Sequence, residues 1–179
     1  MRIIGGSLGG RFLRPNMKGW PTRPTTDISK EALFNILQNR IDFEATKMLD
    51  LFGGAGNHSF EFLSRGCEDV TYVDLHHKCI QFVKKQAEEF EVSDCINVVR
   101  ADVKKFIKST SVKYDYIFAG PPYPLVWLNE IPDMIFQNGL VSDEGFMVME
   151  HNPSHDFMNH AHFKEKRKYG QTIFSFFAL

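Results

Sequence analysis

The sequence predicts a single α/β domain with a mostly parallel, doubly wound sheet of seven strands and helices on both faces. Short apolar runs rich in β-branched residues alternate with helical patterns between residues 46 and 150, and such connections join parallel strands. The first expected strand, 46–52, ends in the glycine-rich turn Gly53-Gly54-Ala55-Gly56. Two later strand-like runs, 163–169 and 172–179, meet at Gly170 and predict an antiparallel hairpin that closes the sheet.

Local signals place the remaining elements. Thr25-Thr26-Asp27 is a helix start signal, and apolar side chains at helical spacing extend that helix to about residue 39. Further strands are expected over 70–74, 96–100, 114–119 and 146–150. Helices are expected between them, over 57–65, 76–90, 104–108 and 126–137.

Composition bounds the class of protein. A chain of 179 residues, 43% of them hydrophobic, suits one folded domain and excludes a disordered protein. No apolar run is long enough to span a bilayer, and the first residues show no apolar signal region. We therefore expect a cytoplasmic protein, with a monomer as the default state. The three cysteines include no Cys-x-x-Cys pair, and His151, His155, His160 and His162 match no zinc spacing, so we expect no metal.

The first 26 residues differ from the rest of the chain. They are interrupted by glycine and proline, which excludes a long helix and allows a short hairpin around Gly9-Gly10. We divide the chain into a basic arm, 1–26, and a domain, 27–179. Six basic residues stand against one acidic residue within 1–30, a local charge of about +5 on a chain whose net charge is −1. A basic arm suits contact with a phosphate backbone, and a solvated terminus explains the charge equally well.

The glycine turn is the first candidate binding site. Its glycines let the backbone bend sharply and approach a ligand closely, and the helix from Asn57 would direct free N–H groups at the turn. In an α/β sheet, nucleotide-like ligands bind at such turns. The full Gly-x-Gly-x-x-Gly pattern of dinucleotide sites is missing, because His58 and Ser59 follow Asn57. The turn therefore suits a nucleoside cofactor without phosphates, namely S-adenosylmethionine.

Three aspartates lie in or just after successive strands. Asp50 is in the first strand, Asp74 ends the second, and Asp102 follows the third. The carboxyl ends of parallel strands line one crevice. Asp74 comes 18 residues after Gly56, a spacing at which a carboxylate can accept hydrogen bonds from both hydroxyls of a ribose. Asp102 is placed to meet an adenine amino group, although a polar strand end facing water explains it as well.

The second candidate site is the turn Gly120-Pro121-Pro122-Tyr123, which follows a central strand. Two prolines make the turn rigid, and their nitrogens donate no hydrogen bonds, so nearby carbonyls are left to accept. The aromatic ring of Tyr123 can stack on a planar group. Methylation of the amino group of a base needs such acceptors and such a ring, often after the base has been flipped out.

With these motifs in view, nearly the whole chain resembles the RsmD-like 16S ribosomal RNA guanine-N2 methyltransferases. The resemblance rests on Met1-Arg2-Ile3-Ile4-Gly5-Gly6, on Arg23-Pro24-Thr25-Thr26-Asp27 with Glu31-Ala32-Leu33-Phe34-Asn35, and on Asp50-Leu51-Phe52-Gly53-Gly54-Ala55-Gly56. Ser64-Arg65-Gly66 and Tyr169-Gly170-Gln171-Thr172 add to it. It implies a Rossmann-like class I methyltransferase fold, S-adenosyl-L-methionine as cofactor, and small-subunit rRNA as partner, either protein-free or within a partly assembled 30S subunit.

The resemblance also implies roles for individual residues. Those that would bind the cofactor are Asp50, Phe52, Gly53, Gly54, Gly56, Asn57, Asp74, Leu75, Asp102 and Val103. Those that would hold the target base are Gly120, Pro121, Pro122 and Tyr123. Those that would lie near RNA or the site are Arg2, Arg11, Arg23 and Thr25.

One position departs from the family pattern. The family turn begins with Asp, whereas this chain has Gly120, so the carboxylate that would accept from the amino group is missing. Losing one preorganised polar group commonly costs a rate factor of about 10² to 10³. Three interpretations stay open: an altered position 120, a weakened enzyme that uses a backbone carbonyl with another acid, or an inactive relative that binds rRNA. Another base or a protein amide is a further alternative substrate, which the Arg-Pro-Thr-Thr-Asp arm argues against.

Overall fold

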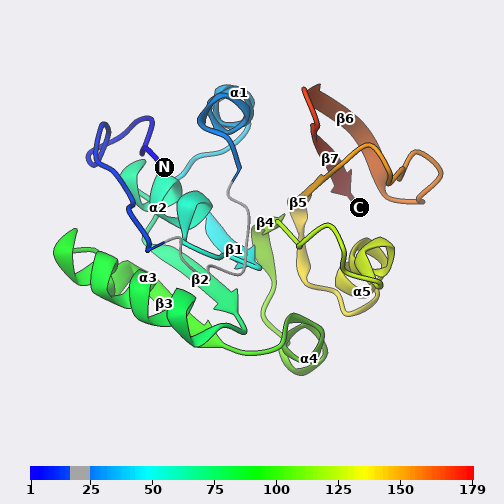
Figure 1. Ribbon diagram of the computed structural model, residues 1–179. Helices are drawn as coiled ribbons and strands as arrows, with labels where there is room; N and C mark the ends of the chain where they lie inside the picture. The colour runs from blue at the N-terminus through cyan, green and yellow to red at the C-terminus, as the bar shows by residue number, and fades with distance from the viewer. Residues whose placement is uncertain (17–24) are drawn as a thin grey trace.

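A computed structural model describes residues 1–16 and 25–179, which form one seven-stranded mixed sheet between two layers of helices (Figure 1). The strand order is β3-β2-β1-β4-β5-β7-β6. Strands β1 to β5 pair in parallel, and β7 pairs antiparallel with both β5 and β6. The strands are β1 Lys47–Leu51, β2 Asp69–Asp74, β3 Ile96–Arg100, β4 Tyr114–Ala119, β5 Val141–His151, β6 Phe163–Tyr169 and β7 Thr172–Ala178. The predicted fold class is confirmed, including the C-terminal hairpin.

The helices begin close to the predicted positions, with one exception. Thr26 caps the first helix, since its side chain accepts the N–H of Ser29. The helices are α1 Asp27–Leu37, α2 Asn57–Ser64, α3 His77–Glu89, α4 Val103–Ser109 and α5 Ile131–Gln137. The prediction that a helix starts at 126 is wrong. Pro132 stands in the first turn of α5, where a missing N–H costs nothing, and a short 3₁₀ helix, η2 Leu128–Glu130, precedes it.

Strand β5 is longer than the predicted 146–150. It begins at Val141 and passes through Ser142, Asp143 and Glu144, which are half-buried or exposed. These residues show no apolar alternation, so the sequence does not mark them as a strand. Tyr114 of β4 faces Val141 and Tyr116 faces Phe146, so Ser142, Asp143 and Glu144 lie within the register shift between these two pairs. The Ser142 hydroxyl donates to the carboxylate of Asp115 at 2.7 Å.

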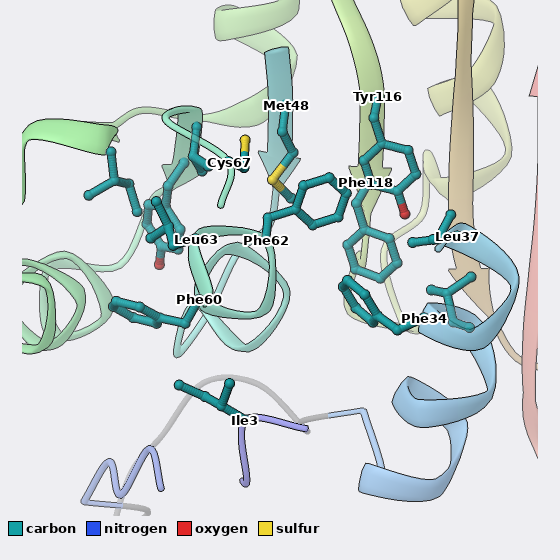
Figure 2. Packing of buried hydrophobic residues seen from close by; sticks show 14 of the residues in the cluster. Ile3, Phe34, Leu37, Met48, Phe60, Phe62, Leu63, Cys67, Tyr116 and Phe118 are labelled. Atoms are coloured by element: carbon teal, nitrogen blue, oxygen red, sulfur yellow. The ribbon is translucent and has the colours of Figure 1, made fainter. Parts of the chain in front are cut away.

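Each face of the sheet is covered by its own hydrophobic cluster. Helices α1, α2 and α3 pack on one face, and Figure 2 shows Phe34 and Phe62 from α1 and α2 beside Phe118 of β4. Helices α4 and α5 pack on the other face around Ile107 and Ile135. In Figure 1 the hairpin β6–β7 lies at the opposite end of the sheet from α3 and β3. No helix in residues 1–16 and 25–179 has the length and apolarity that a membrane crossing requires.

The described part of the N-terminal arm folds onto α2. Ile3 donates its N–H to the carbonyl of Arg11 at 2.9 Å, and an isolated bridge joins Arg2 to Phe12, which confirms the short hairpin around Gly9-Gly10. Ile3, Leu8 and Leu13 are buried in the cluster that contains α1 and α2. Residues 1–13 are therefore packed against the domain, and the predicted boundary at residue 26 stays a prediction.

Candidate functional site

The two motifs singled out in the sequence meet in one cavity of about 250 Å³ at the carboxyl ends of the strands. The strand register brings them together, because Leu51 at the end of β1 faces Ala119 at the end of β4. The backbone N–H of Gly120 donates to the carbonyl of Leu51 at 3.2 Å. The predicted site residues that line the cavity are Thr25, Asp50, Phe52, Gly53, Gly54, Asn57, Gly120, Pro121, Pro122 and Tyr123.

The turn after β1 is tightly constrained. Phe52, which joins the strand to the glycines, has φ +61°, a left-handed conformation that is strained for a bulky residue. At Gly53, an added Cβ would lie 2.2 Å from a ring carbon of Tyr72, so no larger residue fits. The Tyr72 hydroxyl donates to the carbonyl of Gly54. The strain and the close packing hold this backbone against the cavity, as expected of a ligand-binding turn.

Asp74, at the end of β2, fixes the same turn from the side. One carboxylate oxygen accepts the N–H of Gly54 at 3.0 Å, and the other accepts the N–H of His76 at 2.8 Å. The side chain is buried and does not line the cavity, while Leu75 beside it is exposed. A carboxylate has about four lone-pair sites, so both oxygens keep the capacity to accept from a ribose. The predicted ribose contact stays a prediction.

Asp50 is a buried acid that lines the cavity. Its Oδ2 accepts two hydrogen bonds from Ser59, from the backbone N–H at 3.2 Å and from the hydroxyl at 2.6 Å. Burial raises the pKa of Asp50 to about 7, and the bonds from Ser59 oppose this shift. Near neutral pH the side chain can therefore exist with or without its charge, and a cationic group in the cavity would favour the charged form.

Besides Asp74 and Leu75, three further predicted cofactor residues do not line the cavity. Asp102 caps α4, and its Oδ1 accepts the N–H of Lys105 at 3.0 Å. Val103, the first residue of α4, is buried in the core, and Gly56 precedes α2 with φ +74°. The placement of Asp102 at the mouth of β3 agrees with the predicted crevice, and its contact with an adenine stays a prediction.

The sequence analysis missed Lys30, a buried cation in the cavity wall. Its ammonium group donates to Oδ1 of Asn57 at 2.7 Å and lies 3.3 Å from the carboxylate of Glu61. Burial lowers the pKa of Lys30, although the charge of Glu61 acts against this shift. Lys30 lies on α1 just after the Arg-Pro-Thr-Thr-Asp motif. Its place on the same side of the predicted helix as the apolar residues was the sign in the sequence that it is buried.

The sequence analysis also missed Glu150, whose strand pairs with the strand that leads into the Pro-Pro-Tyr turn. It lies on β5 and lines the cavity. Its Oε1 accepts from the Tyr123 hydroxyl at 3.2 Å, and its Oε2 accepts from the Thr25 hydroxyl. Burial raises the pKa of Glu150, while these two bonds lower it. Asp74 was predicted as a site residue because it is an acid at the end of an apolar strand. The same reasoning would have found Glu150.

The predicted RNA contacts are spread over the arm. Arg2 and Arg11 are exposed, and Arg23 lies outside the described residues. The guanidinium of Arg11 sits over the ring of Phe90 at 5.2 Å. Arg11 and Arg14 line a second hollow with the rings of Phe12, Phe82 and Phe90. Lys85, Gln86 and Glu89 complete its lining, and Lys85 pairs with Glu89 at 3.7 Å. This basic and aromatic surface carries Phe12, whose side chain is 51% exposed.

The C-terminal histidines make ordinary contacts in the fold. His151 is buried, and its Nε2 is 2.8 Å from the hydroxyl of Ser175. His160 pairs with Asp133 at 3.1 Å. Within the part of the chain that the structure describes, no group of three or more His, Cys, Asp or Glu side chains is arranged to hold a metal ion.

The strand order 3-2-1-4-5-7-6, with a glycine turn after β1 and a ligand-sized cavity at the carboxyl ends, defines the class I methyltransferase fold. The chain belongs to the family described as "Conserved hypothetical protein 95", which matches residues 1–178. The structure is similar to the solved "Putative methyltransferase yhhF" of Escherichia coli, with a TM-score of 0.84 and 26% identity over 99% of this chain and 96% of that one.

Two relatives of known name support the same class. The chain is 36% identical to the "Putative rRNA methyltransferase YlbH" of Bacillus subtilis over 155 residues, which cover 85% of this chain and 83% of that protein. It is 30% identical to the "Ribosomal RNA small subunit methyltransferase D" of Escherichia coli K12 over 151 residues, which cover 84% and 74% of the two chains. The resemblance to RsmD-like methyltransferases is confirmed at the level of the family.

Proposed function

We propose that this protein transfers a methyl group from S-adenosyl-L-methionine to the exocyclic 2-amino group of a guanine in small-subunit (16S) rRNA. One observation carries the proposal: the glycine turn, the Pro-Pro-Tyr turn and Thr25 of the Arg-Pro-Thr-Thr-Asp motif line the same cavity. A cofactor site and a base site must share one space for direct transfer between them. The names of the two relatives supply the expectation that the base belongs to rRNA.

The residues of the cavity fit this cofactor. Asp50 offers a buried carboxylate to the methionine ammonium group. Lys30 shapes the cavity wall, because its ammonium group is already engaged by Asn57, the carbonyl of Arg2 and Glu61. At Gly53 a Cβ would meet the Tyr72 ring, so glycine lets the turn pack closely in the cavity wall. Asp74 and Asp102 would hold the ribose and the adenine. When bound, the cofactor supplies an electrophilic methyl group.

The remaining work of the protein is positioning and the placement of charge, with no covalent intermediate on the chain. Pro121 and Pro122 hold a rigid turn, and Tyr123 offers its ring to a flipped-out base. The nitrogen of an aromatic amino group is a poor nucleophile because its lone pair is shared with the ring. Acceptors that pull on its hydrogens therefore assist the attack, and the loss of a carboxylate at position 120 bears directly on the rate.

The basic arm would supply the contact with the rRNA backbone. Arg2, Arg11 and Arg23 are the predicted contacts, and the surface around Arg11 adds Arg14, Lys85 and the exposed ring of Phe12. Positive charge next to exposed rings is the combination that binds single-stranded RNA. The substrate would be 16S rRNA, either protein-free or within a partly assembled 30S subunit.

The test is methyl incorporation from labelled S-adenosylmethionine into protein-free 16S rRNA and into small subunits from cells that lack the gene. We expect N2-methylguanosine at a single site, detected by mass spectrometry of nuclease digests. Heat-denatured protein is the control. Methylation of DNA adenine or of a protein amide, with no label in rRNA, would contradict the proposal.

A second candidate function follows from Gly120. A relative without the family carboxylate would bind rRNA and the cofactor without transferring the methyl group. Its signature would be a rise in melting temperature with S-adenosylhomocysteine, since a ligand that binds only the native form raises stability, combined with no label in any rRNA substrate. Activity that appears only in Gly120→Asp would then identify a site disabled at this position.

A further inference from the structure

Glu150 stands beside Gly120, where the family pattern has its carboxylate. In the parallel pairing of β4 with β5, Ala119 faces Met149, so Gly120 and Glu150 are the next pair along the two strands. Neighbouring strands lie about 4.8 Å apart. Side chains alternate between faces along a strand, so Glu150 projects on the same face of the sheet as Val148, toward α1 and the cavity.

The burial of Glu150 calls for an explanation. Its side chain is 7% exposed, and within residues 1–16 and 25–179 no Lys, Arg or His forms an ion pair with it. Its partners are two hydroxyls, from Tyr123 and Thr25. A buried carboxylate without a cation is costly, and such groups in clefts are candidates for function. Both hydroxyls belong to motifs that also line the cavity, so this carboxylate lies where those motifs meet.

The chemistry of guanine matches this carboxylate. The 2-amino group and the adjacent N1–H are two donors on one edge of the base, and one carboxylate can accept from both. Within the described residues, 1–16 and 25–179, each oxygen of Glu150 accepts a single hydrogen bond, and a carboxylate has about four lone-pair sites. Glu150 can therefore accept from the base while it keeps Thr25 and Tyr123.

We propose that Glu150 is the catalytic carboxylate of this chain, accepting from the 2-amino group and N1–H of the target guanine in place of the acid that position 120 lacks. This inference rests on the proposed function. In the transfer, an N–C bond forms while the C–S bond of the methyl donor breaks, and that electron pair stays on sulfur. The amino nitrogen then gives up one proton, which Glu150 accepts and passes to water.

The backbone at position 120 makes the inference testable. Gly120 does not have a positive φ, and among residues 1–16 and 25–179 a Cβ there would come within 4 Å of the Phe118 ring alone, at 3.2 Å. The Cβ of an aspartate at this position therefore needs a shift of a few tenths of an ångström in one side chain. Gly120→Asp can thus return the family carboxylate without rebuilding the turn, so the two positions can be exchanged.

The first experiment compares the wild type, Glu150→Gln, Gly120→Asp and the double variant. We expect Glu150→Gln to lower kcat/KM for rRNA methylation by about 10² or more, with an unchanged Kd for S-adenosylhomocysteine. We expect Gly120→Asp in the Glu150→Gln background to recover at least about tenfold. A purely structural role for Glu150 predicts lost cofactor binding and no rescue. Activity of Glu150→Gln within about threefold of the wild type would overturn the inference.

The second experiment does not depend on turnover. With S-adenosylhomocysteine present, binding of guanosine 5′-monophosphate and inosine 5′-monophosphate is measured by NMR titration, because inosine lacks only the 2-amino group. We expect the wild type to prefer the guanine nucleotide by about tenfold and Glu150→Gln to lose the preference. An equal affinity of the wild type for both would overturn the inference. Discrimination without any rRNA methylation would instead refute the proposed function and leave the role of Glu150 in base recognition standing.

Discussion

The ammonium group of Lys30 lies 3.3 Å from a carboxylate oxygen of Glu61, and the two side chains are 2% and 0% exposed. This pair joins α1 to α2 in the wall of the cavity. Glu61 also accepts the N–H groups of Ile4 and Gly5 at 2.8 and 2.9 Å, so the same carboxylate anchors the N-terminal arm. Helices α1 and α2 and the arm thus meet at the Glu61 carboxylate, which also pairs with Arg65 at 2.9 Å.

Replacing Lys30 by methionine should destabilise the fold. Methionine fills a similar volume but removes one of the two cations of Glu61, which keeps Arg65 at 2.9 Å. It also leaves the acceptors on Asn57 and Arg2 without their donor, so we expect a loss of about 1–3 kcal/mol. Lys47→Met is the matched control, because Lys47 lies at the same distance of 3.3 Å from Asp69, with side chains 42% and 56% exposed, and an exposed pair contributes about 1 kcal/mol or less. Urea unfolding measures both variants. Equal losses would show that burial of the Lys30 pair does not matter.

The stability of the protein should depend on pH through Asp50. Burial raises its pKa in the folded state to about 7, whereas the unfolded chain releases this proton near the ordinary value of 3.8. Between these values the folded state binds more protons than the unfolded state. The contribution of Asp50 to the free energy of unfolding therefore falls as the pH rises through this window.

Asp50→Asn should remove this penalty while its amide oxygen still accepts from Ser59. We expect the stability of the variant relative to the wild type to rise by at most about 3 kcal/mol from pH 5 to pH 8, since about two pH units of this range lie below the folded-state pKa and each corresponds to about 1.4 kcal/mol. Thermal unfolding at the two pH values measures the gap. Asp94→Asn, at an exposed acid, controls for the loss of one charge. A gap that stays constant from pH 5 to pH 8 would refute the buried titration.

The fold was predictable from the sequence because its signals are local. The glycine turn after β1, the cap at Thr26 and Gly170 in the last hairpin each act within a few residues. The misplaced elements lacked such signals or had one that was overlooked. Residues 142–144 of β5 are polar and lie in a register shift, where Ser142 and Asp143 contact Asp115 and Lys113. Pro132 marks the start of α5, and the prediction did not take it into account.

The site was predictable only where a motif is continuous in sequence. The two turns were found, but the residues that complete the cavity wall come from distant parts of the chain. Thr25 and Glu150 are 125 residues apart, and Lys30 meets Glu61 through the packing of two helices. No periodicity or spacing encodes such contacts. The remaining sign was a charged residue next to an apolar run: Lys30 precedes Leu33 and Phe34 at helical spacing, and Glu150 follows the apolar residues 146–149.

Cofactor binding should be sensitive to a single methyl group at position 53. In Gly53→Ala the new Cβ would lie 2.2 Å from the Tyr72 ring, so the turn or the ring must move, at a cost of about 1–3 kcal/mol. We expect the Kd for S-adenosylhomocysteine, measured by calorimetry, to rise at least about tenfold. Gly139→Ala is the control: its φ of +65° strains an alanine, but the space around it is open and lies before β5. Gly139→Ala should lower the melting temperature and leave the Kd for S-adenosylhomocysteine unchanged. An equal rise in this Kd in both variants would show that the turn at Gly53 has no special role in cofactor binding.

The surface around Arg11 should contribute charge to RNA binding that salt can reveal. Each phosphate contact to single-stranded nucleic acid adds about 0.7 to the slope of log K against log salt concentration. Arg11→Ala combined with Arg14→Ala should therefore weaken binding to 16S rRNA fragments and reduce the slope by about 1.4, measured by filter binding over a salt series. Lys108→Ala is the control, because this exposed lysine lies on α4, on the opposite face of the sheet. Binding through fewer phosphate contacts releases fewer counterions and must lower the slope. If neither the arginine variant nor Lys108→Ala changes the slope, the RNA binds elsewhere on the molecule.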